Sequence, residues 1–583
     1  MMSAIKNILL GSLILGLAAC GTKEKITPDA LISTPQGPVQ GVSTDDDGIY
    51  NFKGLPFAAP PVGDLRWAAP KSAENWQETY LADTFGNRCM QPSDVEGGFF
   101  NRLIEGHGLG SFKNFLITRA VAAQKPSPMS EDCLYLNVRT GNLPGDDVAV
   151  KEPQPVMVWI HGGGHQFGSS DFNYYQNNAL VKNGVVLVTI NYRLGAMGYM
   201  AHPELSKTDP NSVSGNYGTL DQIAALKWVK DNISAYGGDP DNVTIFGESA
   251  GSWSVTEMMA SPLAADLFHK AIGQSGASSY HMGQMEGDGV GWPSGYKTGS
   301  KVASALGFET PTAKQLRAVP AKELQNIVTE EMSEGFHHIR DGYVFPENVG
   351  LAFAKGAYNK VPMLFGYNSD EGTLFFPDDT QPTVWLPDVT PGDKAQLETK
   401  LSEAFPDNAS QIIDLYDLDS NFTEGGTQMM GDEIFGVNIR YVAQQNEAHG
   451  EDSFLYFFSR IPPSEKQTLG AFHAAEIPFV FGSHEPVLGL SDDDKALTDL
   501  MQNYWVNFAR TGNPNGDGLP GWPKHDGQNW MHFSANTGLK SGSESGIRQE
   551  KLDALQEGLM VKLKALDSAQ NPPQMEAPTA APN

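Results

Sequence analysis

Uninterrupted apolar runs mark the predicted strands in the middle of the chain. They occupy residues 155–160, 185–191, 243–246, 362–366 and 454–458. Strands that are covered on both faces show such runs, because neither face has to present polar side chains to water. The pattern predicts an α/β fold with a large, mixed, mostly parallel central sheet and helices on both faces.

Other segments show helical or turn-rich patterns. Apolar residues recur at intervals of three and four over 220–233, and again over 497–508, which predicts two amphipathic helices. A further helix is expected over 252–259, and 267–274 is expected to be a helix that runs into a strand. Turn residues between short apolar runs over 29–50 predict small antiparallel strands near the N-terminus.

The strand predicted over 243–246 leads directly into Gly247-Glu248-Ser249-Ala250-Gly251. This pentapeptide fits the pattern G-x-S-x-G, in which a strand turns sharply into a helix and the serine occupies the apex. Glycine is needed on both sides because a Cβ atom would collide across so tight a turn. A glycine-rich turn with an idle serine also fits the pentapeptide alone, so other catalytic groups are needed to decide.

Composition narrows the possible partners. The chain has 583 residues, of which 40% are hydrophobic and 10% aromatic, as expected for a globular protein with a large core. Its formal charge of −29 argues against nucleic acid as a partner. No cluster of metal ligands and no cofactor-binding motif is evident in the sequence, so neither a metal nor a cofactor is expected.

The N-terminus has the pattern of a processing signal. Lys6 precedes an apolar run over 8–17 that is too short to span a bilayer, and the run ends in Leu17-Ala18-Ala19-Cys20. This ending resembles the lipobox of bacterial lipoproteins, in which the chain is cleaved before a cysteine that becomes lipidated. The resemblance implies an exported protein, anchored through Cys20 to a membrane of the bacterial cell envelope at its periplasmic or outer-membrane face; an ordinary secretory signal remains the alternative.

The predicted division of the chain follows from these patterns. Residues 1–19 form the signal peptide, 20–34 a spacer, and 35–567 a single domain. Residues 568–583 are rich in Pro and Ala and are expected to be a disordered tail.

Two cysteines remain once Cys20 is set aside. In an exported protein, Cys89 and Cys133 are most simply read as a disulfide, with two buried thiols as the alternative. The segment between them is long, weakly periodic and rich in glycine, so it is expected to form a surface lobe.

An activated serine needs a general base and an acid that orients the base. In folds with this serine turn, the order along the chain is serine, acid, histidine. Glu371 follows the strand predicted over 362–366, and His473 follows the strand predicted over 454–458. Both residues are therefore expected at the rim of the sheet where α/β active sites form.

The loop His161-Gly162-Gly163-Gly164 follows the strand predicted over 155–160. The N–H groups of Gly163, Gly164 and Ala250 are candidates to stabilise the oxyanion of a tetrahedral intermediate, since glycine allows close approach of the backbone. A glycine-rich loop that merely turns is the alternative.

Together these motifs resemble the type-B carboxylesterases, the carboxylesterase and cholinesterase family of α/β-hydrolases, over about residues 34–533. The matching stretches are 55–67, 131–137, 161–164, 191–195, 238–251, 274–276, 370–372 and 473–482. The resemblance implies an α/β-hydrolase fold with helical insertions over an active-site gorge. It also implies hydrolysis of a small-molecule carboxylic ester through an acyl-enzyme intermediate.

The resemblance assigns roles to individual residues. Ser249 is implied as nucleophile, His473 as base and Glu371 as the orienting acid. Gly163, Gly164 and Ala250 are implied as oxyanion donors. Two structural pairs are also implied, the disulfide Cys89–Cys133 and the ion pair Arg66–Glu131.

One departure from the family pattern is His165, where the family often has an aromatic residue, so a more polar acyl side of the site is expected. The segment between the two cysteines also looks longer than usual for the family. The alternatives within this resemblance are a triacylglycerol lipase, an amidase, and a non-catalytic binding module of the same fold. The last alternative is disfavoured, because such modules typically lack the serine and this chain keeps every catalytic position.

Overall fold

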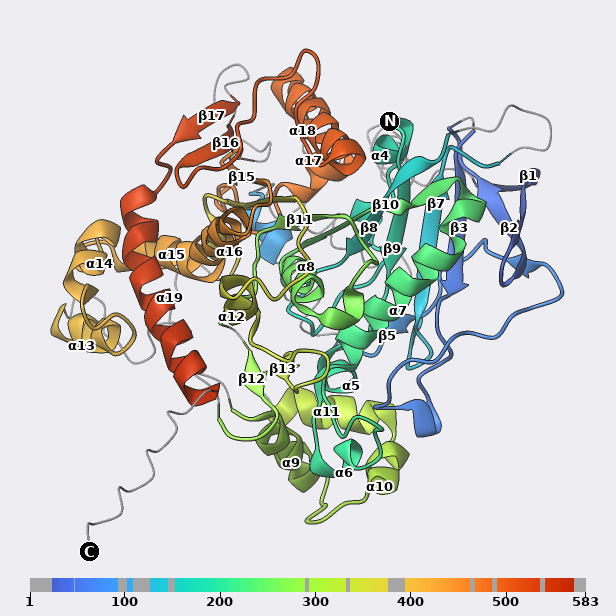
Figure 1. Cartoon of the computed structure of the whole chain (residues 1–583), viewed down its shortest axis with the longest axis horizontal. Coiled ribbons are helices and arrows are strands. Elements are labelled where there is room, and N and C mark those ends of the chain that lie inside the picture. The colour runs from blue at the N-terminus through green and yellow to red at the C-terminus, as the bar shows by residue number, and fades with distance from the viewer. Residues whose placement is uncertain are drawn as a thin grey trace, which may run out of the picture.

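One twisted sheet runs through the centre of the molecule (Figure 1). The structure is a computed structural model and describes residues 24–46, 48–92, 102–108, 126–144, 152–280, 282–288, 293–331, 336–375, 394–461, 467–484, 490–534 and 541–570. Within these residues, 13 strands join in the sheet. In sheet order they are β1 (Lys25–Thr34), β2 (Gly37–Ser43), β3 (Tyr50–Pro56), β7 (Tyr135–Thr140), β9 (Val186–Ile190), β8 (Gln154–Ile160), β10 (Gly238–Glu248), β11 (Lys270–Gln274), β14 (Met363–Asn368), β15 (Ser453–Phe458), β16 (Asn529–Phe533) and β17 (Gly542–Ser545), with β4 (Tyr80–Leu81) paired to β2.

The centre of the sheet is parallel and its ends are antiparallel. From β9 through β16 each neighbouring pair of strands is parallel. The pairs from β1 to β9 and the pair β16–β17 are antiparallel. The fold is therefore the α/β-hydrolase type that the apolar runs and the resemblance predict, including the small antiparallel strands near the N-terminus.

Successive side chains of a strand point to opposite faces of the sheet, and both faces are apolar here. In β8, Val156, Val158 and Ile160 join one core, whereas Met157 and Trp159 join the other. Helices supply the apolar surface that covers each core. On the first face these are α7 (Tyr217–Asn232), α8 (Ala250–Ala260), α12 (Val349–Ala354) and α16 (Val437–Ala448), and on the second α4 (Ala179–Lys182), α17 (Ile477–Phe481) and α18 (Asp492–Thr511).

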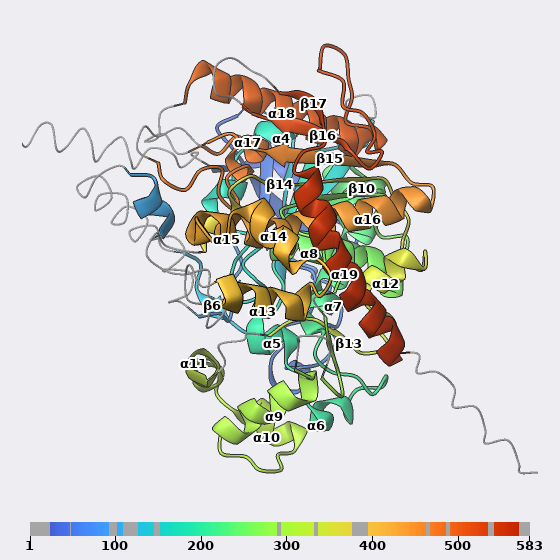
Figure 2. The ribbon, with the colours of Figure 1, turned by 90° about the vertical axis from the view of Figure 1, so that its left-hand side faces the viewer.

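The remaining helices extend beyond the two covering layers. Figure 2 shows α6, α9, α10 and α11 together at one end of the molecule, and α19 running along its side. Of these remaining helices, α13 (Lys394–Ala404), α14 (Ala409–Tyr416), α15 (Phe422–Gly431) and α19 (Gln549–Gln570) add side chains to the first core. The others are α5 (Gly195–Tyr199), α6 (Pro203–Ser206), α9 (Gly295–Ala305), α10 (Ala313–Ala318) and α11 (Ala321–Glu331). Short strand pairs outside the main sheet are β5 (Arg88–Cys89) with β6 (Met129–Ser130), and β12 (Gly283–Gln284) with β13 (Ile339–Arg340).

The prediction of a helix at the start of 267–274 is wrong. Pro262 begins only a short 3-10 turn, and Asp266 then has a φ of 60°. This left-handed conformation stops a helix, so the chain passes through a loop into β11. The strand half of the prediction is confirmed.

The predicted segment boundaries differ from the observed elements at both ends. Residues 25–34 of the expected spacer 20–34 form β1, whose backbone pairs with β2, so most of this segment is not a free tether. At the other end, α19 continues to Gln570, past the expected start of the tail at 568. The predicted signal peptide 1–19, Cys20 and residues 571–583 lie outside the described residues.

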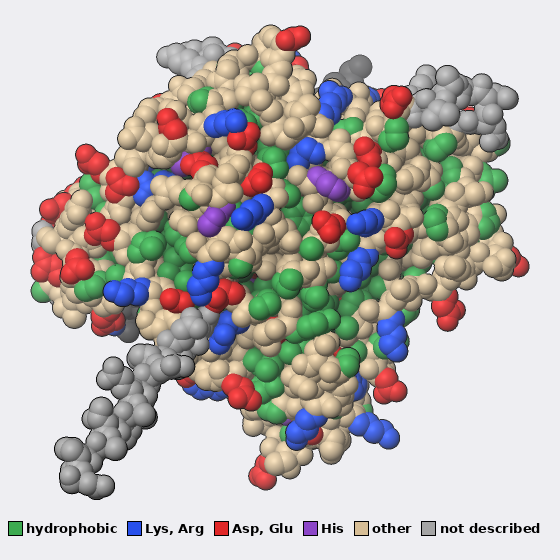
Figure 3. Space-filling model, viewed as in Figure 1, with side chains coloured by type: hydrophobic (Ala, Val, Ile, Leu, Met, Phe, Trp, Pro, Cys, Tyr) green, Lys and Arg blue, Asp and Glu red, His purple; other side chains and the backbone are tan. Residues whose placement is uncertain are grey.

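The acidic composition is visible on the surface. Figure 3 shows acidic side chains spread over the face seen in Figure 1, with Lys and Arg side chains between them. No described helix combines the length and apolarity needed to cross a bilayer.

Candidate active site

Ser249 lies at the tip of a sharp turn between β10 and α8. Its φ is 57° and its ψ is −125°, a conformation that non-glycine residues rarely adopt. The turn is anchored because the Ser249 N–H donates to the carbonyl of Gln274 on the neighbouring strand, at 2.9 Å. The strained turn that the pentapeptide predicts is confirmed.

The two flanking glycines are required by the space around them. A Cβ atom at Gly251 would lie 2.0 Å from the carbonyl oxygen of Ile160, and one at Gly247 would lie 2.5 Å from the backbone of Gly251. Both contacts are with main-chain atoms, which cannot rotate away. The pattern G-x-S-x-G therefore follows from the close approach of α8 to strands β8 and β10.

His473 and Glu371 meet near this turn, although 102 residues separate them. The Nδ1 atom of His473 lies 2.6 Å from Oε2 of Glu371, and both side chains are buried. The other carboxylate oxygen of Glu371 accepts the N–H of Asn368 at 2.6 Å. This bond fixes the carboxylate at the end of β14, so the imidazole is held in one orientation.

Asp370 is not the carboxylate that orients the histidine ring. Its Oδ2 accepts the N–H of Ala471 at 2.8 Å and the hydroxyl of Ser369 at 2.6 Å. Asp370 therefore holds the backbone of the loop that carries His473, while Glu371 binds the ring itself.

A third carboxylate, Glu248, faces the other nitrogen of the ring. His473 Nε2 and Glu248 Oε1 lie 3.1 Å apart, but their geometry does not meet that of a hydrogen bond. Among the described residues, the hydroxyl of Ser249 forms no hydrogen bond. His473 and Glu371 are thus in place as an acid–base pair. In this structure His473 Nε2, the nitrogen expected to accept the proton of Ser249, lies beside Glu248.

The pKa values of this pair reflect burial among several carboxylates. Burial by itself lowers the pKa of His473, but the charges of Glu248 and Glu371 have the opposite effect and leave it above its usual range. Burial raises the pKa of Glu248, and the neighbouring carboxylates of Glu476 and Glu371 add to this, while His473 opposes it. His473 and Glu248 therefore each bind a proton more tightly than an isolated histidine or glutamate side chain does.

Glu476 is a further buried carboxylate that sequence analysis did not place in the site. It accepts hydrogen bonds from Gln274 at 3.0 Å and from the side chain of Asn368 at 2.6 Å. Gln274 also holds the backbone of Ser249, and Asn368 also holds Glu371. Glu476 thus connects the serine turn to the acid–base pair.

The glycine loop after β8 lies against the serine turn. A Cβ atom at Gly162 would lie 3.0 Å from Cβ of Ser249. Gly163 and Gly164 have φ values of 103° and 62°, which only glycine adopts easily. Among the described residues, the N–H groups of Gly163 and Gly164 donate no hydrogen bond, and that of Ala250 is the first of α8 and has no acceptor within the helix.

The next residue, His165, is fully buried behind this loop. Its Nε2 lies 3.0 Å from the hydroxyl of Ser254 on α8. Burial lowers the pKa of His165 to about 3, so its imidazole is neutral. The hydrogen bond to Ser254 joins His165 to α8, the helix that begins directly after Ser249.

Comparison with known proteins agrees with this geometry. Residues 28–554 match the carboxylesterase family. The chain belongs to the carboxylesterase family. It is 34% identical to para-nitrobenzyl esterase of Bacillus subtilis (strain 168) over 544 residues, which cover 89% of this chain and 98% of that one. It is also 34% identical to fumonisin B1 esterase of Sphingopyxis macrogoltabida over 565 residues, covering 94% and 93% of the two chains.

Solved structures give the same result. A structure of PNB esterase is 32% identical and superposes with a TM-score of 0.74, over 90% of this chain and 99% of the other. The carboxylesterase fold and its activity class are thereby established together. The chain is a carboxylic ester hydrolase of the serine type.

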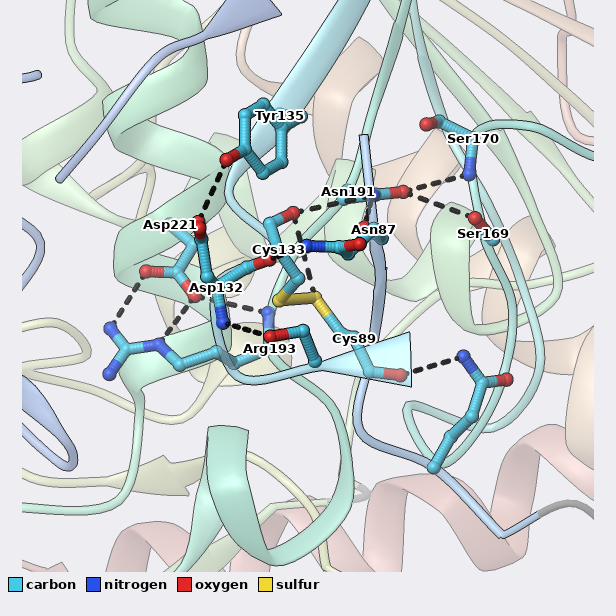
Figure 4. The surroundings of a disulfide bond; sticks show 12 residues. Asn87, Cys89, Asp132, Cys133, Tyr135, Ser169, Ser170, Asn191, Arg193 and Asp221 are labelled. Carbon is cyan, nitrogen blue, oxygen red and sulfur yellow. Dashed lines mark hydrogen bonds and ion pairs between the residues drawn. A yellow bond between two sulfur atoms is a disulfide. The ribbon is translucent and has the colours of Figure 1, made fainter. Parts of the chain in front are cut away.

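Two further pairs expected for a carboxylesterase are present. Cys89 and Cys133 form a disulfide with an S–S distance of 2.07 Å, which Figure 4 shows in its surroundings. The side chain of Asn191 donates to the carbonyl of Cys133 at 3.3 Å, so the bridge is tied to the end of β9. Arg66 binds Glu131 through two hydrogen bonds, one of them 2.6 Å long between Nε and Oε2, which confirms the predicted ion pair.

Proposed function

We propose that Ser249 is the nucleophile of this carboxylesterase, His473 its general base and Glu371 the acid that orients the base. The observation that carries this assignment is the 2.6 Å contact between His473 and Glu371 beside a serine held at a φ of 57°. The proposal requires His473 Nε2 to accept the proton of the Ser249 hydroxyl, a contact that these two residues do not make in this structure, where Nε2 lies 3.1 Å from Glu248 Oε1. Apo structures often hold such contacts longer than the reacting complex does.

The reaction follows from these roles. His473 takes the proton of the Ser249 hydroxyl while the serine oxygen attacks the ester carbonyl, and the alcohol then leaves with that proton. Water, activated by the same histidine, releases the acid from the acyl-enzyme. Glu371 stabilises the imidazolium formed in both steps.

The oxyanion would be stabilised by the N–H groups of Gly163, Gly164 and Ala250. These donors lack acceptors within the described residues, and they lie on the two elements that meet at Ser249. Preorganised donors of this kind act without the cost of reorienting at the moment of reaction.

The proposed substrates are small-molecule carboxylic esters, in line with the names of the two bacterial relatives. The alternative is a triacylglycerol lipase. Hydrolysis of p-nitrophenyl esters from acetyl to long-chain acyl groups distinguishes the two: an esterase shows its highest kcat/KM on short acyl chains in solution. Preference for long chains, with a rise in rate at the onset of an oil–water interface, would favour the lipase. Absence of turnover on every ester would favour a non-catalytic binding module.

The second part of the proposal is that the protein is a lipoprotein of the cell envelope, anchored through lipidated Cys20. Its support is the segment Leu17-Ala18-Ala19-Cys20 after an apolar run. Mass spectrometry of the membrane-extracted protein should find a mature chain that begins at acylated Cys20, and Cys20→Ser should abolish membrane association. An unmodified Cys20 in the mature chain, or a mature terminus elsewhere, would contradict the anchor.

A further inference from the structure

A second cluster of ionisable side chains lies behind the serine turn, in the core rather than at the candidate active site. It consists of His165 from the loop after β8, Glu257 from α8, and His338 just before β13 (Figure 1 shows α8 and β13). Each residue offers one ligand atom, and these atoms all lie within 4.8 Å of one another. All three side chains are at most 1% exposed.

The atoms that converge in this cluster share one property. Within the described residues, His165 Nδ1, His338 Nδ1 and the two carboxylate oxygens of Glu257 have no partner in good hydrogen-bond geometry. His338 Nδ1 and Glu257 Oε1 lie 2.8 Å apart, but not in hydrogen-bond geometry. A buried carboxylate without well-formed hydrogen bonds depends on nearby positive charge, and a cation bound between Glu257 and the two imidazoles would supply it.

The opposite nitrogen of each ring is held by a serine hydroxyl. His165 Nε2 lies 3.0 Å from Ser254 Oγ, and His338 Nε2 lies 3.2 Å from Ser278 Oγ. Metal-binding histidines usually donate their second N–H to such an acceptor, which fixes the tautomer and aims the first nitrogen at the metal. Both histidines therefore have the outer hydrogen bond that a ligand needs.

The serines are themselves fixed. Gln222 on α7 donates to Ser254 Oγ at 2.9 Å, and the backbone N–H of Ser278 donates to Thr256 Oγ1, also at 2.9 Å. Two hydrogen bonds with the side chain of Asn216 hold the residue after His338, Ile339, at 2.9 Å and 2.7 Å. The cluster is thus held by residues of α7 and α8, by the segment after β11 and by Asn216 just before α7.

We propose that His165, Glu257 and His338 bind one divalent transition-metal ion of the zinc class. Two imidazole nitrogens and one carboxylate form a ligand set that zinc uses, with water or a second carboxylate oxygen as the fourth ligand. Tetrahedral zinc with ligand distances of about 2.0–2.2 Å needs its ligand atoms about 3.4 Å from one another. His338 Nδ1 and Glu257 Oε1, now 2.8 Å apart, would therefore move apart when the ion binds.

The position of the site gives it a structural role. Glu257 belongs to the helix that begins after Ser249, and His165 directly follows the glycine loop that carries the proposed oxyanion donors. A metal ion would join these two elements from behind. The described contacts of His165, Glu257 and His338 do not include Ser249, so the effect of the metal on hydrolysis would act through the relative position of the two elements.

The test is the metal content of the untagged full-length protein. After dialysis with one equivalent of Zn²⁺ and removal of loosely held metal, mass spectrometry should find about one zinc per chain. A chelator strong enough to strip the zinc should lower the Tm, and the cobalt-substituted protein should show the ligand-field absorption of a tetrahedral site.

Glu257→Gln should lose the metal, and Glu447→Gln should keep it. Glu447 is a matched control, since its Oε1 lies 2.8 Å from Nδ1 of the buried His525, and no second histidine of the described residues joins this pair in a ligand cluster. If Glu257→Gln does not fold, the metal content of the wild type still decides. Less than about a tenth of an equivalent in the wild type would overturn the proposal, and the cluster would then be a metal-free contact of imidazole and carboxylate. Equal metal in the wild type and in Glu257→Gln would show an adventitious ion only.

Discussion

The carboxylate of Glu248 beside His473 leads to a prediction about pH. Hydrolysis needs neutral His473, because only the neutral ring can accept the serine proton. A charge on Glu248 favours the protonated ring. Replacing Glu248 with Gln keeps the shape of the side chain but removes that charge. The pKa of His473 should therefore fall, and the acid limb of kcat/KM should move to lower pH.

The structure sets the scale of this shift. Two unit charges at the 3.1 Å between His473 Nε2 and Glu248 Oε1 interact by about 5 kcal/mol at an effective dielectric constant of 20, which corresponds to ~4 pKa units as an upper bound. Burial raises the pKa of Glu248 itself, so this residue is protonated over part of the range and the expected shift is smaller. We expect the acid limb to move down by about 1–3 units.

The assay is kcat/KM against pH for the wild type, Glu248→Gln and a control variant, Glu544→Gln. Glu544 also contacts a histidine, His532, at 2.6 Å, but on β17 at the edge of the sheet. The control should leave the limb in place. An acid limb of Glu248→Gln at the wild-type pH, or at higher pH, would show that Glu248 carries no charge that His473 experiences, and the reasoning would be refuted.

Three further substitutions test the site and its turn. Ser249→Ala should lower kcat by roughly 10⁴–10⁶-fold with the fold retained by circular dichroism, and residual activity above about a tenth of wild type would remove Ser249 as nucleophile. Glu371→Gln keeps a hydrogen-bond acceptor but loses the charge that stabilises the imidazolium. Steady-state kinetics should therefore show a drop in kcat of about 10³–10⁴-fold with a smaller change in KM, whereas a wild-type rate would mean that Glu371 does not orient the base. Gly251→Ala would place a methyl group 2.0 Å from the carbonyl of Ile160, so denaturant unfolding should show a loss of about 3 kcal/mol or more. The matched change Gly521→Ala, which meets nothing within 4 Å, should cost far less, and equal effects would contradict the steric account.

The fold class was predictable because its signals are local. Buried parallel strands leave uninterrupted apolar runs, and the predicted run over 243–246 lies within β10. The helix α19 could also have been found, since Leu552, Leu555 and Leu559 repeat at helical spacing and are buried. The expected helix at the start of 267–274 does not form, and the sequence gives no sign of the left-handed conformation of Asp266 just before it.

The proposed triad was predictable for a different reason. The serine turn requires glycine at fixed positions, and this requirement is visible in the sequence. Glu371 and His473 could be selected because each follows a strand of the parallel sheet, and the carboxyl ends of parallel strands meet at one edge. Asp370 follows the same strand, and the contacts of each carboxylate in the structure distinguish it from Glu371.

The sequence by itself thus determined the sheet, the serine turn and the residue types of the catalytic chemistry, since each depends on neighbours within a few positions. Only the tertiary structure decided which side chains face one another across long separations. Glu248 meets His473 across 225 residues of chain, a contact that no local pattern encodes. His165, Glu257 and His338 likewise lie far apart in the chain and come together only because α8 packs behind the glycine loop. The charge on a buried group depends on all its neighbours in space, and folding alone brings those neighbours together.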